Sequence, residues 1–305
     1  MVAKGELVKE TIEIEGVTRN YLYYVPSSLQ DEALVPLLFS FHGAGSDANY
    51  HSRLTNFHKL AESEQFIVIY PESKQIKNGD PRSKQWNEGK EGNLAYQTGS
   101  KDVQFIKELL HQWNITYNIA SDQVYATGFS NGASFSLRLA LEMPGTFSAV
   151  GAVAGPLPKV YKKKETGVLP PLVFVMGNED PVVPYAEEDA KGEVSYEVDG
   201  LLGAKSTVEW WTYQSASSWE IKNERLSPIS LHDSTRVERS LYVAEKEVMT
   251  AVLYTVKGGG HTWPGGPKVQ VPAFGRVSRQ IDTSKLLWDS FQLLNQQKST
   301  LLGDE

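Results

Sequence analysis

Three segments of the sequence carry residue types that together could perform nucleophilic catalysis. The first is Gly128-Phe-Ser-Asn-Gly132, a G-x-S-x-G motif with Ser130 at its centre. The apolar residues 124–127 predict a buried strand before it, and residues 133–141 predict a helix after it. In the context of a strand, a tight turn and a helix, this motif exposes a nucleophilic serine. By itself, it also fits a glycine-rich turn with a solvated serine.

The second segment contains two candidate acids and follows another predicted buried strand, residues 172–176. Glu179 and Asp180 both come just after this strand, at the edge of the sheet where the serine is expected. Asp180 precedes a proline, which keeps its backbone extended. We therefore favour Asp180 over Glu179 as the partner of a catalytic histidine. The alternative is that Asp180 only caps a turn, since Asp-Pro is a common turn signal.

The third segment places His261 in a glycine-rich loop, residues 258–266, directly after a predicted strand at 248–256. A histidine in such a loop can reach across to the serine. The chain order Ser130, Asp180, His261 is that of α/β-hydrolases. The sequence thus predicts a nucleophile, an orienting acid and a general base, in that order. The remaining histidines lie in predicted helices or lack such a loop: His42, His51, His58, His111 and His232.

A fourth segment, His42-Gly-Ala-Gly45, follows the continuous apolar strand at 35–41. Backbone N–H groups of such a loop can bind the oxygen that becomes negative when a carbonyl is attacked. We expect an oxyanion hole formed by the N–H of Asn131 and that of Ala44 or its neighbour. An ordinary turn is the alternative. His42 itself is expected to form structural hydrogen bonds.

Alternating strand and helix patterns, from residue 35 to 295, must position these residues. They predict one α/β-hydrolase domain spanning residues 1–305, with a mostly parallel central sheet and helices on both faces. An antiparallel hairpin of residues 7–14 and 21–25 is expected to open the chain. Further predicted strands are 66–70, 147–154 and 237–243, and predicted helices are 51–64, 102–113, 206–214 and 280–294.

Tryptophans near the predicted site could line a substrate cleft. Trp86 lies in a long polar connection, residues 72–100, and Trp263 follows the candidate histidine. We expect both to contact substrate, with Trp210 or Trp211 as further candidates. A place in the hydrophobic core is the alternative for each of them.

Composition narrows the classes of partner. The chain has 305 residues, 40% of them hydrophobic, and a net charge of −7 without a basic cluster, which argues against nucleic acid or a membrane. It has no cysteine, so disulfides and thiolate chemistry are excluded. No apolar signal-peptide segment is visible near Met1, so we expect a cytoplasmic protein, or a secreted one if a leader was removed.

The four motifs together resemble the poly(3-hydroxybutyrate) depolymerase-like esterases, a group that shades into feruloyl and acetylxylan esterases. The matching segments are Phe41-His-Gly-Ala-Gly45, Tyr125-Ala-Thr-Gly-Phe-Ser-Asn-Gly132, Gly177-Asn-Glu-Asp-Pro-Val-Val-Pro-Tyr185 and Gly258-Gly-Gly-His-Thr-Trp-Pro-Gly265. The resemblance extends over roughly residues 10–297. It implies an α/β-hydrolase fold and an esterase acting on hydroxyacyl, feruloyl or acetyl esters. Family members often carry cysteines and a second glycine where this chain has Ala133.

The expected reaction is ester hydrolysis through an acyl-enzyme on Ser130, with no cofactor and no metal. The expected partner is a small or oligomeric ester. A serine peptidase or amidase on the same fold is the main alternative, because amide cleavage can use the same three residues. A binding module without catalysis is the other alternative, although no member of the predicted triad is missing.

Overall fold

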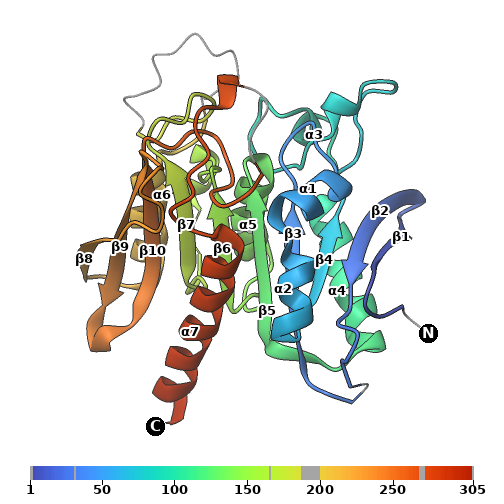
Figure 1. Ribbon diagram of the computed structural model, residues 1–305. Coiled ribbons are helices and arrows are strands. Elements are labelled where there is room, and N and C mark those ends of the chain that lie inside the picture. Colours follow the sequence, from blue (N-terminus) through green and yellow to red (C-terminus); the bar gives the residue numbers. More distant parts are fainter. Residues whose placement is uncertain (1–2, 31, 165, 187–199, 268–271, 304–305) are drawn as a thin grey trace.

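The computed structural model describes residues 3–30, 32–164, 166–186, 200–267 and 272–303 (Figure 1). The strands are β1 (Leu7–Ile14), β2 (Val17–Tyr24), β3 (Val35–Phe41), β4 (Ile67–Pro71), β5 (Ile119–Phe129), β6 (Ala149–Val153), β7 (Leu172–Gly177), β8 (Trp219–Arg225), β9 (Arg236–Ala244) and β10 (Met249–Lys257). The α-helices are α1 (Ala48–Thr55), α2 (Phe57–Glu64), α3 (Leu94–Gln97), α4 (Asp102–Thr116), α5 (Asn131–Glu142), α6 (Ala204–Ser215) and α7 (Thr283–Gly303). Short 3₁₀ turns are η1 (Pro81–Ser83), η2 (Lys159–Lys163), η4 (Glu245–Glu247) and η5 (Pro272–Phe274).

All ten strands join one sheet in the order β1-β2-β4-β3-β5-β6-β7-β10-β9-β8. The six central strands, from β4 to β10, pair in parallel. Antiparallel pairs extend the sheet at both sides, β1-β2 at one and β9-β8 at the other. The predicted mostly parallel sheet with an N-terminal hairpin is confirmed. Because the central strands are parallel, the loops that follow β3, β5, β7 and β10 meet at one edge of the sheet.

Helices cover both faces of this sheet, as the sequence predicted. Helices α4, α5 and α6 pack on one face, and α1, α2 and α7 pack on the other (Figure 1). Successive side chains of a strand point to opposite faces of the sheet. In β3, Leu37 and Phe39 pack on the face that α4, α5 and α6 cover, and Leu38 packs on the face that α1, α2 and α7 cover. Each fully buried Leu or Phe contributes roughly 1.5–3 kcal/mol through removal of apolar surface from water.

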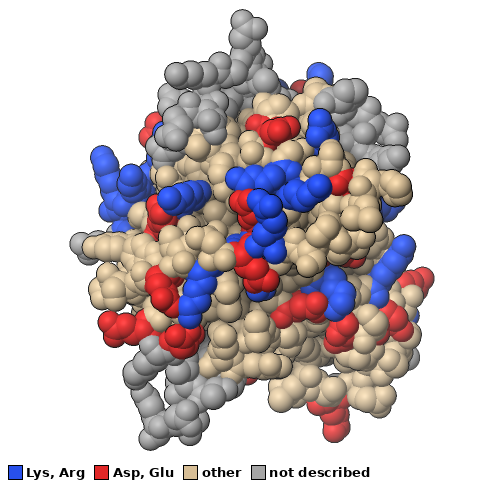
Figure 2. Space-filling model, turned by 60° about the vertical axis from the view of Figure 1, so that its left-hand side comes forward, with Lys and Arg blue, Asp and Glu red and all other residues tan. Residues whose placement is uncertain are grey.

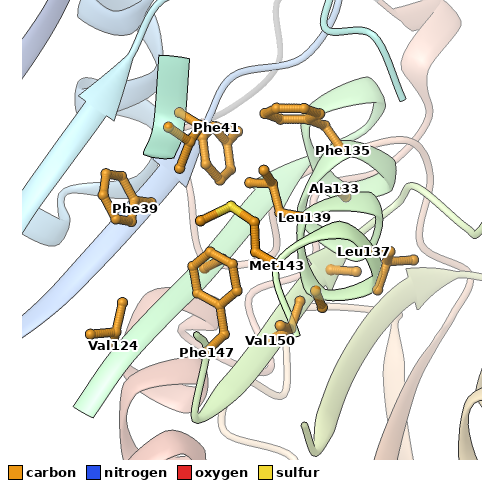
Figure 3. Packing of buried hydrophobic residues seen from close by; sticks show 14 of the residues in the cluster. Phe39, Phe41, Val124, Ala133, Phe135, Leu137, Leu139, Met143, Phe147 and Val150 are labelled. Carbon is orange, nitrogen blue, oxygen red and sulfur yellow. The ribbon is translucent and has the colours of Figure 1, made fainter. Parts of the chain in front are cut away.

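The packing of α5 on the sheet fixes the start of this helix. Phe135 and Leu139 of α5 point toward Phe41 of β3 and, with Met143, pack against the sheet (Figure 3). The rings of Phe41 and Phe135 meet edge to face, with centroids 5.2 Å apart. The first turn of α5 is therefore held above the carboxyl ends of β3 and β5.

Several elements differ from the sequence prediction; among them, the short helix α3 lies in the connection 72–100, where no helix was predicted, and β5 begins at Ile119 rather than at residue 124. The expected helix 51–64 is two helices, because Asn56 adopts a left-handed conformation (φ 52°) in which its N–H donates to the Ser52 carbonyl and ends α1. Strand β8 was not predicted, since its side chains are nearly all exposed and lack apolar alternation.

Strand β8 is an edge strand that is covered with charge. Lys222 lies near Glu220 and Glu247, and Arg225 lies near Glu238. Figure 2, which brings this side of the molecule forward, shows basic and acidic side chains interspersed on the surface. Charged side chains on an edge strand oppose pairing with another chain. Within the described ranges, no helix is both long enough and apolar enough to cross a membrane.

Candidate active site

Ser130 lies in a tight turn between β5 and α5. Its backbone is in an unusual conformation (φ 55°, ψ −124°), and its N–H donates to the carbonyl of Val153 at the end of β6. A Cβ on Gly128 would lie 2.4 Å from the Gly132 carbonyl, and one on Gly132 would lie 2.4 Å from the carbonyl oxygen of His42. Both glycines of the motif are therefore required, because a larger residue would collide with backbone.

His261 reaches Ser130 from the loop after β10. Its N–H donates to the carbonyl of Phe274, and the N–H of Gly260 donates to that of Arg276, so two bonds fix this part of the loop. The imidazole Nε2 lies 2.9 Å from the Ser130 Oγ. His261 is 5% exposed, and its ring packs against that of Phe129. The loop thus holds a mostly buried imidazole against the hydroxyl.

Asp180, and not Glu179, contacts the histidine. Its Oδ2 lies 2.8 Å from the His261 Nδ1, and its side chain is fully buried. Its Oδ1 accepts the N–H groups of Val182 and Val183, each at 2.8 Å. Glu179 is exposed to solvent. When the His261 Nδ1–H donates to Asp180, Nε2 is free to accept the serine proton.

Backbone N–H groups suited to an oxyanion lie beside Ser130. Asn131 is the first residue of α5, where a backbone N–H has no carbonyl partner within the helix. Ala44 lines the same cavity as Ser130 and Asn131. The N–H of Gly45 is already engaged, because it donates to the Lys84 carbonyl at 2.8 Å. Between Ala44 and Gly45 of the loop 42–45, the backbone N–H of Ala44 is therefore the better oxyanion donor.

His42 supports this loop through structural hydrogen bonds. Its Nδ1 lies 2.7 Å from the Gly43 carbonyl oxygen, and its Nε2 accepts the Ser73 N–H at 3.0 Å. Burial lowers the pKa of His42 to about 4, so the ring is neutral near pH 7. Both ring nitrogens are occupied, which rules this histidine out as the base.

The expectation that Trp86 offers its ring to a substrate does not agree with its position. The side chain is fully buried and stacks on Phe135, with ring centroids 4.9 Å apart. Its Nε1–H donates to the His42 carbonyl at 3.0 Å. Trp86 connects the loop of residues 42–45 to α5 and lies in the hydrophobic core, so a substrate cannot stack on its ring.

Trp263 is also a core residue rather than a cleft aromatic. It is 2% exposed, its Nε1–H donates to the Ser284 Oγ, and its ring meets Phe57 edge to face. It anchors the His261 loop on the α1, α2 and α7 side of the sheet. Trp211 is likewise fully buried, and Trp210 is half-buried on α6.

Sequence reasoning missed a polar network around the Asn131 side chain. The Asn131 Oδ1 accepts the Trp86 N–H at 2.7 Å, and the Asn131 Nδ2 donates to the Trp86 carbonyl and to the Glu88 Oε2. The Asn93 Nδ2 donates to the same Glu88 oxygen at 2.6 Å. Burial raises the pKa of Glu88 to about 7. The only sequence signal was one acid close to Trp86 in a long polar connection.

A cavity of about 350 Å³ opens beside Ser130. Three apolar side chains form one part of its wall, namely Val182, Val183 and Leu201. Its polar lining residues are Gln85, Glu88, Lys90, Asn93, Asn131 and Ser134. A larger cavity of about 700 Å³ lies near the start of β6, β7 and β10, at the opposite edge of the sheet, and does not include Ser130.

Among the residues that the structure describes, no group of three or more His, Cys, Asp or Glu side chains is arranged to hold a metal ion.

Comparison with known families and proteins agrees with the fold. The profile of the family described as "putative esterase" matches residues 15–258. The chain therefore belongs to this esterase family, and it is a carboxylic-ester hydrolase. This result confirms the resemblance read from the motifs.

Among curated proteins, the chain is 28% identical over 291 residues to "Putative esterase NocK" of Nocardia uniformis subsp. tsuyamanensis, covering 93% of this chain and 82% of that protein. It is 30% identical over 173 residues to "Bifunctional acetylxylan esterase/xylanase XynS20E" of Neocallimastix patriciarum, covering 57% and 23%. It is 29% identical over 137 residues to "Poly(3-hydroxyalkanoate) depolymerase C" of Paucimonas lemoignei, covering 43% and 30%. The matches thus span less than a third of the latter two relatives.

Among solved structures, the chain resembles an acetyl xylan esterase from Aspergillus awamori, with a TM-score of 0.57 and 16% identity over 93% of this chain and 99% of that one. It also resembles esterase PE8, with a TM-score of 0.53 and 17% identity over 89% and 97%. At these identities the likeness shows the fold, which is that of α/β-hydrolases.

Proposed function

We propose that the protein hydrolyses short-chain carboxylic esters through an acyl-enzyme on Ser130. His261 takes the proton of the hydroxyl as the oxygen attacks the ester carbonyl, and Asp180 orients the imidazole and stabilises its cation. The N–H groups of Asn131 and Ala44 bind the oxyanion. His261 then gives the proton to the departing alkoxide. A water molecule, deprotonated by His261, attacks the acyl-enzyme and releases the acid.

One observation carries this proposal: an unbroken hydrogen-bonded series runs from Asp180 through His261 to Ser130. Its two links are 2.8 and 2.9 Å long. Contacts of this length are what proton transfer from a serine requires. The series ends at a strained residue that lines a cavity, where an ester can reach the hydroxyl.

The cavity favours a short acyl group. Its volume is about 350 Å³, and among the described residues its apolar lining consists of Ala44, Val182, Val183 and Leu201, which does not suit a long alkyl chain. The polar part of the cavity wall can form hydrogen bonds with hydroxyl or carbonyl groups of a substrate. We therefore propose acetyl or short hydroxyalkanoate esters as substrates, in preference to the bulkier feruloyl esters that the sequence resemblance also implied, and relatives named for acetylxylan and poly(3-hydroxyalkanoate) esters support this choice.

Hydrolysis of a p-nitrophenyl ester series, from acetate to octanoate, tests the proposal. We expect the highest kcat/KM for the shortest acyl groups, and Ser130→Ala should lower kcat by several orders of magnitude, roughly 10⁴-fold or more. A matched anilide separates esterase from amidase activity. Activity that survives in Ser130→Ala would contradict the mechanism, and a maximum at octanoate would contradict the short acyl group.

A further inference from the structure

Glu88 has no role in the mechanism above, yet it is an acidic group buried in the wall of the candidate site. It is 6% exposed and lines the cavity that contains Ser130. Its Oε2 accepts two amide N–H groups, from Asn131 at 2.7 Å and from Asn93 at 2.6 Å. Burying a carboxyl group costs free energy unless hydrogen bonds compensate it, so its position next to Asn131 calls for an explanation.

The Asn131 side chain links Glu88 to the proposed oxyanion hole. Asn131 follows Ser130 directly, and its own backbone N–H is the expected oxyanion donor. Three hydrogen bonds tie its amide group to the segment 86–88: Oδ1 accepts the Trp86 N–H at 2.7 Å, and Nδ2 donates to the Trp86 carbonyl and to Glu88. The Asn131 side-chain amide is held at both its oxygen and its nitrogen and therefore cannot rotate. This restrains the backbone of Asn131, whose N–H is the expected oxyanion donor.

The segment 86–88 is itself fixed from other elements, so it can serve as a rigid support. The Asn87 N–H donates to Asp102 of α4 at 2.8 Å. The Asn87 carbonyl accepts from Arg138 of α5 at 2.7 Å. The Trp86 ring is packed in the core against Phe135. Glu88 therefore holds a place that does not depend on Asn131.

We propose that Glu88 is a positioning residue for ester hydrolysis: its carboxyl group holds the Asn131 side chain and thereby directs the Asn131 backbone N–H at the oxyanion. This inference rests on the proposed function. A carboxyl oxygen has two lone pairs and can accept both amide N–H groups at once, which suits this place between Asn93 and Asn131. An oxyanion donor acts on the transition state, so loss of its alignment lowers kcat more than it changes KM.

A double-mutant cycle between Glu88 and Asn131 tests the inference. Glu88→Met keeps the length of the side chain and removes the acceptor. Asn131→Ala removes the held amide and keeps the backbone N–H. We expect each variant to lower kcat about 10- to 100-fold for p-nitrophenyl acetate, with KM changed by less than about three-fold. Because both act through one contact, the double variant should be no slower than the slower single variant.

Glu88→Gln is the matched control, since its side-chain oxygen can still accept from both amides. It should retain a kcat within about five-fold of the native enzyme, well above that of Glu88→Met. Independent, multiplicative losses in the cycle would overturn the inference, and so would a change confined to KM or a Glu88→Gln variant as slow as Glu88→Met. If Glu88→Met does not fold, as judged by circular dichroism, an unchanged kcat in Asn131→Ala alone would overturn it.

Failure of the proposed function gives a different pattern of results. If the native protein hydrolyses no ester, or if Ser130→Ala retains the activity, the proposed function fails and this inference fails with it. If the native activity depends on Ser130 but the cycle shows no coupling, only the role of Glu88 is refuted.

Discussion

Two groups of residues flank Ser130, and they are built in different ways. On one side, His261 and Asp180 come from the loops after β10 and β7. They form a linear series of hydrogen bonds from Asp180 to His261 and from His261 to Ser130. On the other side, Trp86, Glu88 and Asn131 form a branched network in which each residue makes more than one hydrogen bond. A linear series suits the proposed transfer of one proton from Ser130 to His261, with Asp180 holding the imidazole in place. A branched network suits groups that must stay in place, so in the proposed mechanism one side transfers the proton and the other gives rigid support.

The largest effect should come from the proton-transfer side. Asp180→Asn should lower kcat about 10⁴-fold with little change in stability, because an amide favours the wrong tautomer of His261. Steady-state kinetics with p-nitrophenyl acetate measures this effect. Glu179→Gln is the matched control from the same loop: its side chain is exposed, and kcat should stay within about two-fold. Equal losses in the two variants would contradict the assignment of the acid.

On the supporting side, a substitution should affect stability first. Trp86→Ala removes a fully buried ring from between Phe135 and the oxyanion loop and should lower the free energy of unfolding by about 3–5 kcal/mol. Urea unfolding followed by circular dichroism measures this change. Trp86→Phe, which keeps an aromatic ring, should cost less. Trp210→Phe on α6 is the control, since this ring is only half-buried. If Trp86→Ala were no less stable than the control, the network would not be a rigid support.

The smallest predicted effect is a pH dependence of stability from Glu88. Its pKa is about 7 in the folded protein against 4.5 for a free carboxyl, chiefly because of burial, with Lys90 acting in the opposite direction. Between these values the native state keeps a proton that the unfolded chain has lost, so stability falls as pH rises through this window. Above pH 7 the cost reaches about 3 kcal/mol.

Glu88→Gln cannot ionise and should escape this cost. The difference in unfolding free energy between Glu88→Gln and the native protein should shift in favour of the variant as the pH rises from about 4.5 to about 7. Burial, with a smaller contribution from Glu88, raises the pKa of Tyr161, so this hydroxyl stays neutral in this range. A pH-independent difference would contradict the raised pKa, because it would show that Glu88 loses its proton at the same pH in the folded and the unfolded protein.

The sequence predicted the proton-transfer side because its signals are local. Ser130, Asp180 and His261 each follow a strand, and the parallel order of β5, β7 and β10 brings the ends of these strands together. Gly128 and Gly132 are required because a larger side chain would collide with neighbouring backbone atoms, and this requirement holds in any chain with this turn. The central sheet was predictable for the same reason, since its strands are continuous apolar runs.

The supporting side could not be predicted, because its signals depend on tertiary contacts. The burial of Trp86 depends on α5 and on the strand β3, both distant in the sequence. The contact of Glu88 with Asn131 joins residues 43 positions apart. The sequence analysis missed the left-handed conformation of Asn56 and the exposed strand β8. Neither is marked by a regular spacing of apolar residues.

In the proposed mechanism Ser130 becomes acylated during ester hydrolysis, and mass spectrometry can detect this acyl-enzyme. The native protein is mixed with p-nitrophenyl acetate, quenched in acid within the first turnover and digested. The account predicts a burst of p-nitrophenol and one acetyl group on the peptide that contains Ser130, with neither in Ser130→Ala. Hydrolysis without an acylated Ser130 peptide, or an acetyl group on another residue that persists in Ser130→Ala, would contradict it.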